Sequence, residues 1–229
     1  MSAIESVIAK HPVFAGLTEA QIAFLTAAST ARQFQKGDFL TMQGDFWPYL
    51  FLVLRGQVNA QKMSVEGRNL IVTSLHAGDL FWGLAFFQED TPMPVSLEAV
   101  KPTQVRLWSR QDLLPFLLQN GQVAWNLSCL MVRRMSQASE IIHTLAFQPV
   151  AGRLARFLVD LSPEQKSPVA RSLTLDEMAA HVGSTREVVC RFLQRFANDG
   201  LIDITRTEFT INDMDGLKEI AQQGKGGSF

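Results

Sequence analysis

Four polar residues share one side of a predicted helix that begins near residue 185. They are Arg186, Glu187, Cys190 and Arg191. The apolar residues of the same stretch cover the complementary arc of about 140°, at about 100° per residue: Val188, Val189, Phe192, Leu193 and Phe196. Arginine can donate paired hydrogen bonds to guanine O6 and N7, and glutamate can accept one from cytosine N4. The residue types and their spacing therefore suit the reading of base edges in DNA.

An ordinary solvated helix face would also carry these charges, with an i,i+4 ion pair between Glu187 and Arg191. The flanking sequence favours DNA reading. Thr174 is placed to cap a short preceding helix, and Gly183 to provide the turn. Ser184 is placed to cap the second helix, with Glu187 as its capping-box partner. These features predict a helix-turn-helix.

A hairpin is expected after the two helices, with Leu201–Thr205 and Glu208–Ile211 as its strands. Arg206 at its tip would lie near a DNA phosphate as part of a wing, and Arg195 would meet another phosphate. The predicted DNA-binding residues are Ser184, Thr185, Arg186, Glu187, Cys190, Arg191, Arg195 and Arg206.

The region from 30 to 110 is predicted to be a β-domain, because glycines divide it into short apolar or alternating runs. The expected strands are Tyr49–Leu54, Gln57–Met63, Leu70–Leu75 and Gln104–Trp108. Strands at this spacing indicate a compact antiparallel barrel, roll or sandwich. Residues 2–28 are predicted to form short helices that precede it.

A long helix is predicted from 121 to 147, and it carries a heptad seam. The seam residues are Leu127, Met131, Arg134, Ala138, Ile141 and Leu145, with Leu130, Met135 and Ile142 beside them. The seam would serve either a buried core helix or a dimer helix. The dimer is favoured, because the β-domain is too small to cover both apolar edges of the helix. Pro149 marks a break after which a new domain begins.

Composition limits the function classes. The chain has 229 residues, a formal net charge of −1, 47% apolar and 19% charged residues, so any DNA contact must come from a local cluster of charge. Its cysteines, Cys129 and Cys190, lie far apart and form no CxxC pair, which argues against a zinc ribbon and a cysteine-held iron–sulfur cluster. No nucleophile–base pair, metal triad or phosphate loop is recognisable, so an enzyme is not expected. The apolar runs are too short for a signal peptide or a bilayer span, and a cytoplasmic protein is expected.

Several motifs together resemble the CRP/FNR family of bacterial transcription regulators, over nearly the whole chain. They are KGDFLTMQGD, LFLVLRGQV, AGDLFWGLAFF, the long helix and GSTREVVCRFLQRFANDGLI. The resemblance implies an α+β chain with an N-terminal antiparallel β-roll sensor of the cyclic-nucleotide-binding type at 1–120, a dimerisation helix at 121–147 and a C-terminal winged helix-turn-helix at 148–229.

The same resemblance implies a homodimer in which an effector in the β-roll reorients the DNA-binding domains. The expected partners are double-stranded DNA with a near-palindromic site and RNA polymerase, and no membrane. Arg186, Glu187 and Arg191 would occupy base-reading positions, with half-sites resembling TGTGA or TTGA. Cys190 stands where one branch of the family has serine and another has glycine.

Cyclic AMP is not expected as the effector. Cyclic-nucleotide-binding members carry a Gly-Glu pair followed by an Arg-Ser pair that binds the phosphate. Here Gly83 is followed by Leu84, and the Arg-Ser pair falls near Met93-Pro94. Binding would need Arg106, Arg55 or Lys62 to swing into the pocket from a neighbouring strand. The N-terminal cysteine cluster of oxygen-sensing members is absent as well, so an iron–sulfur cluster is not expected.

The residues expected near the pocket are apolar: Leu80, Phe81, Trp82, Leu84, Phe86, Phe87 and Met93. They suit an apolar ligand or a haem, or the collapsed core of a sensor with no ligand. A collapsed core or an unknown effector is favoured. Haem would need an axial ligand, for which the candidates are His11, His76, His143 and His181, although each also fits an ordinary position. A further alternative is redox control through Cys190, whose thiol lies near two arginines; it would otherwise fill a small-residue position against DNA.

Overall fold

The computed structural model describes residues 2–162, 169–170, 173–205 and 208–222. The chain divides into two compact units: residues 1–62 with 72–137, and residues 63–71 with 138–229. The long helix α5 (Gly121–Phe147) contributes to both units. Its bounds are those expected from the sequence.

Short helices begin the first unit, as predicted. They are α1 (Ala3–Lys10), the 3-10 helix η1 (Pro12–Phe14) and α2 (Glu19–Ala27). Each α-helix starts with a capping box, formed by Ser2 with Glu5 and by Thr18 with Gln21. These local hydrogen bonds satisfy backbone amides that the first helical turn leaves unpaired.

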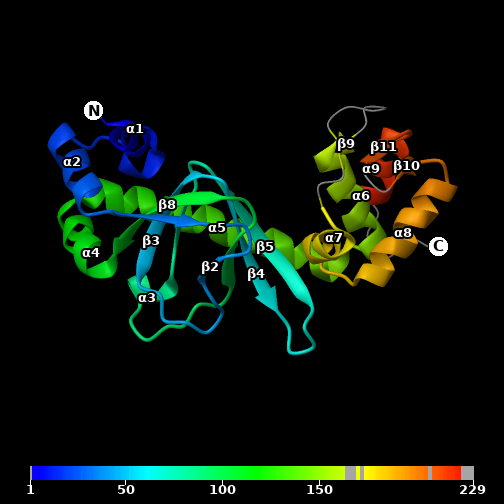
Figure 1. Ribbon diagram of the computed structural model, residues 1–229, viewed down its shortest axis with the longest axis horizontal. Coiled ribbons are helices and arrows are strands. Elements are labelled where there is room, and N and C mark those ends of the chain that lie inside the picture. The colour runs from blue at the N-terminus through cyan, green and yellow to red at the C-terminus, as the bar shows by residue number, and fades with distance from the viewer. Residues whose placement is uncertain (1, 163–168, 171–172, 206–207, 223–229) are drawn as a thin grey trace. The chain divides into compact units, whose positions relative to one another are not determined.

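Two four-stranded antiparallel sheets form the β-roll (Figure 1). The first has the order β1 (Thr30–Phe34), β8 (Thr103–Ser109), β3 (Tyr49–Arg55) and β6 (Leu80–Trp82). The second has the order β2 (Phe39–Thr41), β7 (Ser96–Ala99), β4 (Gln57–Met63) and β5 (Asn69–His76). Two further helices complete the unit: α3 (Leu84–Phe87) and α4 (Arg110–Gln119). The four expected strands are confirmed.

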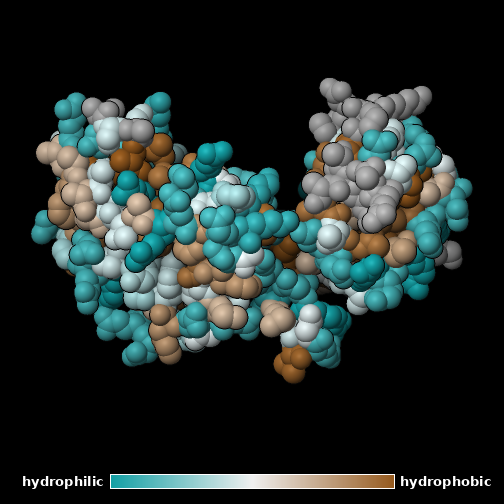
Figure 2. All heavy atoms as spheres, in the orientation of Figure 1, coloured by the Kyte–Doolittle hydropathy of each residue, from teal (hydrophilic) through white to brown (hydrophobic). Residues whose placement is uncertain are grey.

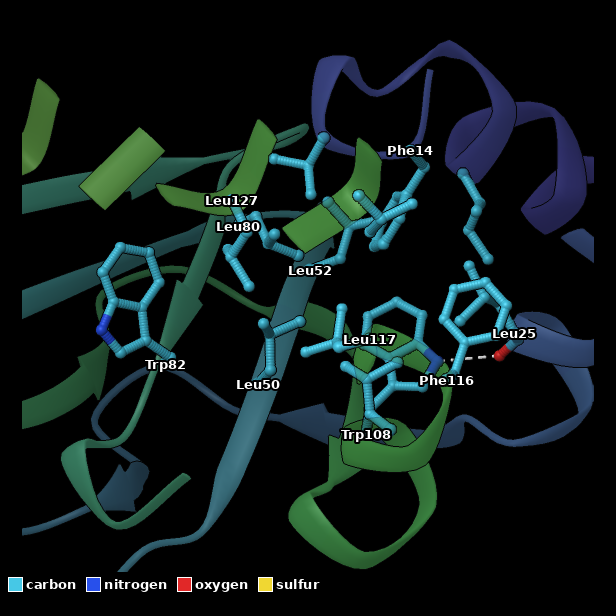
Figure 3. Packing of buried hydrophobic residues seen from close by; sticks show 14 of the residues in the cluster. Phe14, Leu25, Leu50, Leu52, Leu80, Trp82, Trp108, Phe116, Leu117 and Leu127 are labelled. Atoms are coloured by element: carbon cyan, nitrogen blue, oxygen red, sulfur yellow. Dashed lines mark hydrogen bonds between the residues drawn. The ribbon is translucent and has the colours of Figure 1, made fainter. Parts of the chain in front are cut away.

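Strand β3 separates two hydrophobic cores because its side chains alternate between the faces of the sheet. Leu50 and Leu52 belong to a cluster with the helices, whereas Phe51 and Val53 belong to the cluster inside the roll. Figure 3 shows the helical side, where the indole Nε1 of Trp108 donates a hydrogen bond of 2.8 Å to the carbonyl of Leu25. The buried indole N–H thus has the partner that its burial requires.

The second unit holds the remaining elements. They are α6 (Val150–Leu161), β9 (Val169–Ala170), α7 (Leu175–Val182), α8 (Arg186–Asn198), β10 (Ile202–Ile204), β11 (Glu208–Ile211) and α9 (Met214–Gln222). The strands form an antiparallel sheet of order β10-β11-β9. A single apolar cluster joins α6, α7, α8 and the hairpin. The predicted α+β architecture, with a long helix and a C-terminal winged helix-turn-helix, is confirmed.

Candidate DNA-binding surface

Local hydrogen bonds fix the first helix of the helix-turn-helix. The Thr174 hydroxyl accepts from the backbone amide of Glu177 at 3.2 Å, and the Glu177 carboxylate accepts from the backbone amide of Thr174 at 2.6 Å. Gly183 ends α7 with φ +62°, a left-handed conformation that glycine adopts without steric cost. The predicted cap and turn are both confirmed.

The start of α8 differs from the expectation by one residue. Thr185, in extended conformation, is the N-cap, and its hydroxyl accepts from the amide of Val188 at 3.5 Å. Counted from this cap, the third helical residue is Val188, so Glu187 lies too early to serve as a capping-box partner. The prediction of a Ser184–Glu187 capping box was wrong.

The two faces of α8 are those predicted. Val189, Leu193 and Phe196 are buried in the apolar cluster of the unit. Arg186, Glu187 and Arg191 are exposed on the complementary face, and Cys190 beside them is half-buried. The structure therefore brings the candidate base-reading residues together on one accessible surface near the start of the helix.

Charged and polar groups on this surface influence one another. Hydrogen bonds from its own backbone amide and from the Thr185 side chain hold the pKa of Glu187 below the usual value, with a smaller contribution from the nearby Arg186. Glu187 is therefore a carboxylate acceptor at neutral pH. Arg191 lies over the Phe192 ring at 5.6 Å from its centroid. Arg195 pairs with Asp199 at 3.7 Å, one helical turn further on.

Two residues of this unit were not singled out from the sequence. Asp176 of α7 forms an ion pair with Arg186, with 3.2 Å between Oδ2 and Nη1. Arg153 of α6 donates from Nε to the carbonyl of Val182 at 2.7 Å and from Nη2 to that of Gly183 at 3.3 Å. Its Nη1 donates to the carbonyl of Gln148 at 2.7 Å. These contacts join residues that are 5 to 30 positions apart in the sequence. Caps and helical periodicity relate only close neighbours, so they do not predict these contacts.

The predicted wing corresponds to strands β10 and β11, which pair in antiparallel register. At the turn between them, the Thr205 amide donates to the carbonyl of Glu208 at 2.9 Å. Arg206, the expected phosphate contact at the tip, and its neighbour Thr207 lie outside the described residues.

The predicted dimer seam of α5 turns largely inward. Leu127 is 3% exposed in the core of its own β-roll, and Met131 packs against that core. Arg134 pairs with Asp79 of the roll, with 3.2 Å between Nη2 and Oδ1. Ile141 and Leu145 are half-buried, and only Ala138 of the six is exposed. Five of the six side chains are thus engaged, wholly or partly, within the chain itself.

A different heptad series of α5 is exposed. Its large members are Trp125, Val132, Met135 and Ile142, which are 67%, 58%, 69% and 67% exposed. Ser128, Ser139 and Ala146 complete the 3,4 spacing on the same exposed face. The apolar pattern of the sequence does not mark this series, because two of its positions are serine. Only Met135 and Ile142 had been noted, at the edge of the other seam.

The expected effector residues are divided between two hydrophobic clusters. Leu80, Trp82 and Phe86 face the helical core, whereas Phe81 and Met93 belong to the cluster inside the roll. Leu84 is half-buried and Phe87 is exposed. Trp47, Phe51 and Phe81 form consecutive edge contacts in the interior, with ring centroids 5.5 and 6.1 Å apart. Aromatic side chains therefore fill part of the space within the roll.

The three cations considered for the pocket lie on strands β8, β3 and β4. Arg106 lies between Val105 and Leu107, which point into the roll, so it lies on the face that also holds Trp108. Arg55 and Lys62 are exposed near strand ends. The buried polar residues of the described chain are Thr41, Asn59, Thr103 and Ser162, none of them charged. No charged side chain is therefore buried in the described part of the roll.

Tight packing surrounds the start of α3. A Cβ on Gly83 would lie 1.8 Å from the carbonyl oxygen of Trp47, so only glycine fits there. The haem-ligand candidates lie elsewhere: His11 caps η1, His76 ends β5, His143 is exposed on α5 and His181 stacks on Phe157. Among the residues that the structure describes, no three His, Cys, Asp or Glu side chains gather as metal ligands.

Two family models match the chain. A cyclic nucleotide-binding domain matches residues 31–120, which hold the β-roll, and a Crp-like helix-turn-helix domain matches residues 152–220. The chain belongs to the CRP/FNR family of transcription regulators.

Relatives in this family align over almost the full length. The chain is 27% identical over 210 residues to the "Cyclic AMP receptor protein" of Thermus thermophilus, covering 92% of this chain and 96% of that protein. It is 26% identical over 227 residues to the "CRP-like cAMP-activated global transcriptional regulator" of Mycobacterium tuberculosis, covering 96% and 100%. A solved CRP/FNR-family structure from Eubacterium rectale has 25% identity and a TM-score of 0.78, with 93% and 98% of the chains covered.

Membership of the CRP/FNR family makes the protein a transcription regulator with a helix-turn-helix DNA-binding domain, and not an enzyme. Within the described part of the chain, no helix combines the length and hydrophobicity needed to cross a bilayer.

Proposed function

We propose that the protein is a homodimeric regulator that reads a near-palindromic DNA site through α8. The observation that carries the proposal is the division of α8 into a buried apolar face and an exposed face with Arg186, Glu187 and Arg191 at its start. In helix-turn-helix proteins the first turns of the second helix meet base edges in the major groove. Ser184, Thr185, Cys190 and Arg195 border the same surface, and Arg206 is proposed as the wing contact.

We propose that two copies of the chain pair through the exposed heptad series of α5, and that the resulting dimer binds DNA with two-fold symmetry. Trp125, Val132, Met135 and Ile142 would be covered by the same residues of a second copy, since a two-fold interface is self-complementary. The small Ser128 and Ser139 would let the two helices approach closely. Two recognition helices related in this way would reach half-sites about one helical turn apart. A regulator bound there would contact RNA polymerase as its protein partner.

The effector is proposed to be something other than cyclic AMP, or none. The relatives from Thermus and Mycobacterium are named for cyclic AMP, but recognition of a cyclic phosphate needs a cation and an acceptor for the ribose hydroxyl. Here Leu84 and Met93 stand at the positions concerned, and Trp47, Phe51 and Phe81 pack together in the interior. An uncompensated phosphate in that environment would lose charge-assisted hydrogen bonds of about 1.5–3 kcal/mol each.

The test is selection of DNA sites by the purified full-length protein, followed by fluorescence anisotropy on the selected duplex and on single base-pair variants. Arg191→Ala should cost about 1–3 kcal/mol and relax the preference at one G·C pair of each half-site. Arg156→Ala removes an exposed arginine of α6 and serves as the matched control. A uniform loss of affinity across all sequences, with base preference intact, would refute base reading by α8.

A further inference from the structure

Asp176 and Arg186 face each other across the turn of the helix-turn-helix. Their Oδ2 and Nη1 atoms are 3.2 Å apart, and their side chains are 68% and 60% exposed. Asp176 is the second residue of α7, whose start is held by the Thr174–Glu177 capping box. Arg186 is the first residue of α8. A carboxylate therefore lies beside an arginine on the surface that is proposed to contact DNA.

The carboxylate acts differently on the two kinds of acceptor that DNA offers. Guanine O6 and N7 are uncharged, and a guanidinium with five N–H donors can bind both while it still donates to a carboxylate. A phosphate is anionic, so the carboxylate repels it and competes with it for the same cation. Asp176 thus weakens the binding of Arg186 to a DNA phosphate more than it weakens the binding of Arg186 to a base edge.

We propose that Asp176 is a specificity-determining residue: its carboxylate orients Arg186 towards a guanine edge and opposes capture of Arg186 by phosphate at non-cognate DNA. The inference rests on the proposed function, because it requires α8 to read bases. It assigns a role to a residue of α7, outside the recognition helix.

A merely structural role predicts a different outcome. Ion pairs this exposed contribute little to folding, and Glu177 supplies a second acidic residue in the first turn of α7. Loss of the Asp176 carboxylate should therefore reduce the discrimination between base pairs, while the melting temperature of the protein should stay close to that of the wild type. A loss of helix stability alone would not change the discrimination between base pairs at one position of the site, so this discrimination is the quantity to measure.

The experiment compares the full-length protein with its Asp176→Asn variant by fluorescence anisotropy. Three duplexes are used: the site selected by the wild type, the same site with the base pair read by Arg186 exchanged, and a scrambled sequence, each over a series of salt concentrations. Asp176→Asn should bind the scrambled duplex about two- to fivefold more tightly, as expected for an exposed ion pair. Its salt dependence should steepen by about one phosphate contact, and discrimination against the exchanged base pair should fall.

Asp199→Asn is the matched control. It removes the same charge from the same unit, where Asp199 pairs with Arg195 at 3.7 Å. This control should raise affinity for all three duplexes alike and leave base preference unchanged. In the Arg186→Ala background, Asp176→Asn should no longer affect preference, because the coupling between the two residues has been removed.

The outcomes separate the inference from the proposed function. If the wild type shows no sequence preference at all, the proposed function fails. If the wild type is selective but Asp176→Asn changes preference no more than Asp199→Asn, or changes it equally without Arg186, the inference is overturned and the proposed function stands. If Asp176→Asn melts below the wild type, Asp176→Glu decides: restored discrimination supports the charge pair, and its continued loss overturns it.

Discussion

Replacement of Arg153 tests how much the hydrogen bonds of one side chain to the turn before α8 stabilise the DNA-binding unit against unfolding. Its guanidinium donates to the carbonyls of Val182, Gly183 and Gln148, at 2.7, 3.3 and 2.7 Å. Val182 ends α7, and Gln148 directly follows α5, so the positive charge sits at two helix C-termini, where the macrodipole is negative. Burial lowers the pKa of Arg153, but a guanidinium remains protonated at neutral pH.

The magnitude follows from the geometry of the three acceptors. A lysine ammonium is a single point and cannot span carbonyls that three separate guanidinium nitrogens reach. Arg153→Lys should therefore lose two of the three hydrogen bonds, and Arg153→Leu all three. Because the site is half-buried and water replaces part of each bond, about 1 kcal/mol per bond is appropriate. The expected losses in unfolding free energy are about 2 kcal/mol for Arg153→Lys and about 3 kcal/mol for Arg153→Leu.

Scanning calorimetry of the full-length variants measures the effect. For a domain of about 60–100 residues, a loss of 1 kcal/mol lowers the melting temperature by about 4–8 °C. The transition of the DNA-binding unit should therefore shift down by about 10 °C in Arg153→Lys. Arg156→Lys is the control, because Arg156 is 66% exposed and lies 4.0 Å from its partner Asp160. It should melt within about 1–2 °C of the wild type.

The reasoning would be refuted if Arg153→Lys melted with the wild type while Arg153→Leu did not. That result would mean that the charge alone matters and that the three carbonyl contacts carry no stability. Equal melting of all three proteins would mean that water satisfies these carbonyls as well as Arg153 does.

Three further predictions follow from the same structure. Ile142→Asp should turn the dimer into a monomer in light scattering, because it places a charge within the proposed interface. Val65→Asp, in the exposed turn between β4 and β5, should not. Figure 2 shows that hydrophobic residues also reach the surface in several places on the face that it draws. Calorimetric titration should detect no binding of cyclic AMP or cyclic GMP, because none of the buried residues in the described part of the chain is a cation. Burial lowers the pKa of His11 and His181 below 6.5. The unfolded chain therefore binds more protons in acid, and stability should fall as the pH drops through 6.5.

Each of these predictions has a decisive contrary result. A wild-type protein that is monomeric at micromolar concentration would exclude the interface on α5. A low-micromolar dissociation constant for cyclic AMP would show that the phosphate-binding turn lies elsewhere. Urea midpoints that depend on pH equally after both histidines are replaced by glutamine would assign the acid sensitivity to other groups.

The sequence by itself determined the helix-turn-helix because its signals are local. Thr174 and Glu177 are three residues apart, Gly183 sets the turn by its own conformation, and the apolar period of α8 defines the buried face. The cap of α8 was misplaced by one residue, since Ser184 and Thr185 are both good caps. In the structure the amide of Ser184 still donates to the carbonyl of Ala179 in α7 at 2.9 Å, and Thr185 is the extended residue that caps α8.

Only the tertiary structure decided which edge of α5 faces inward. Both edges are apolar, and the choice depends on packing of Leu127 with Leu52 and Leu80, residues far away in the sequence (Figure 3). The same holds for Arg153 and Asp176, whose partners lie up to 30 and 10 positions away. Periodicity and caps report on neighbours along the chain. Tertiary packing decides which distant segments fold against each other. That packing therefore sets the ion pair of Asp176, the hydrogen bonds of Arg153 to backbone carbonyls, and which apolar face of α5 is buried.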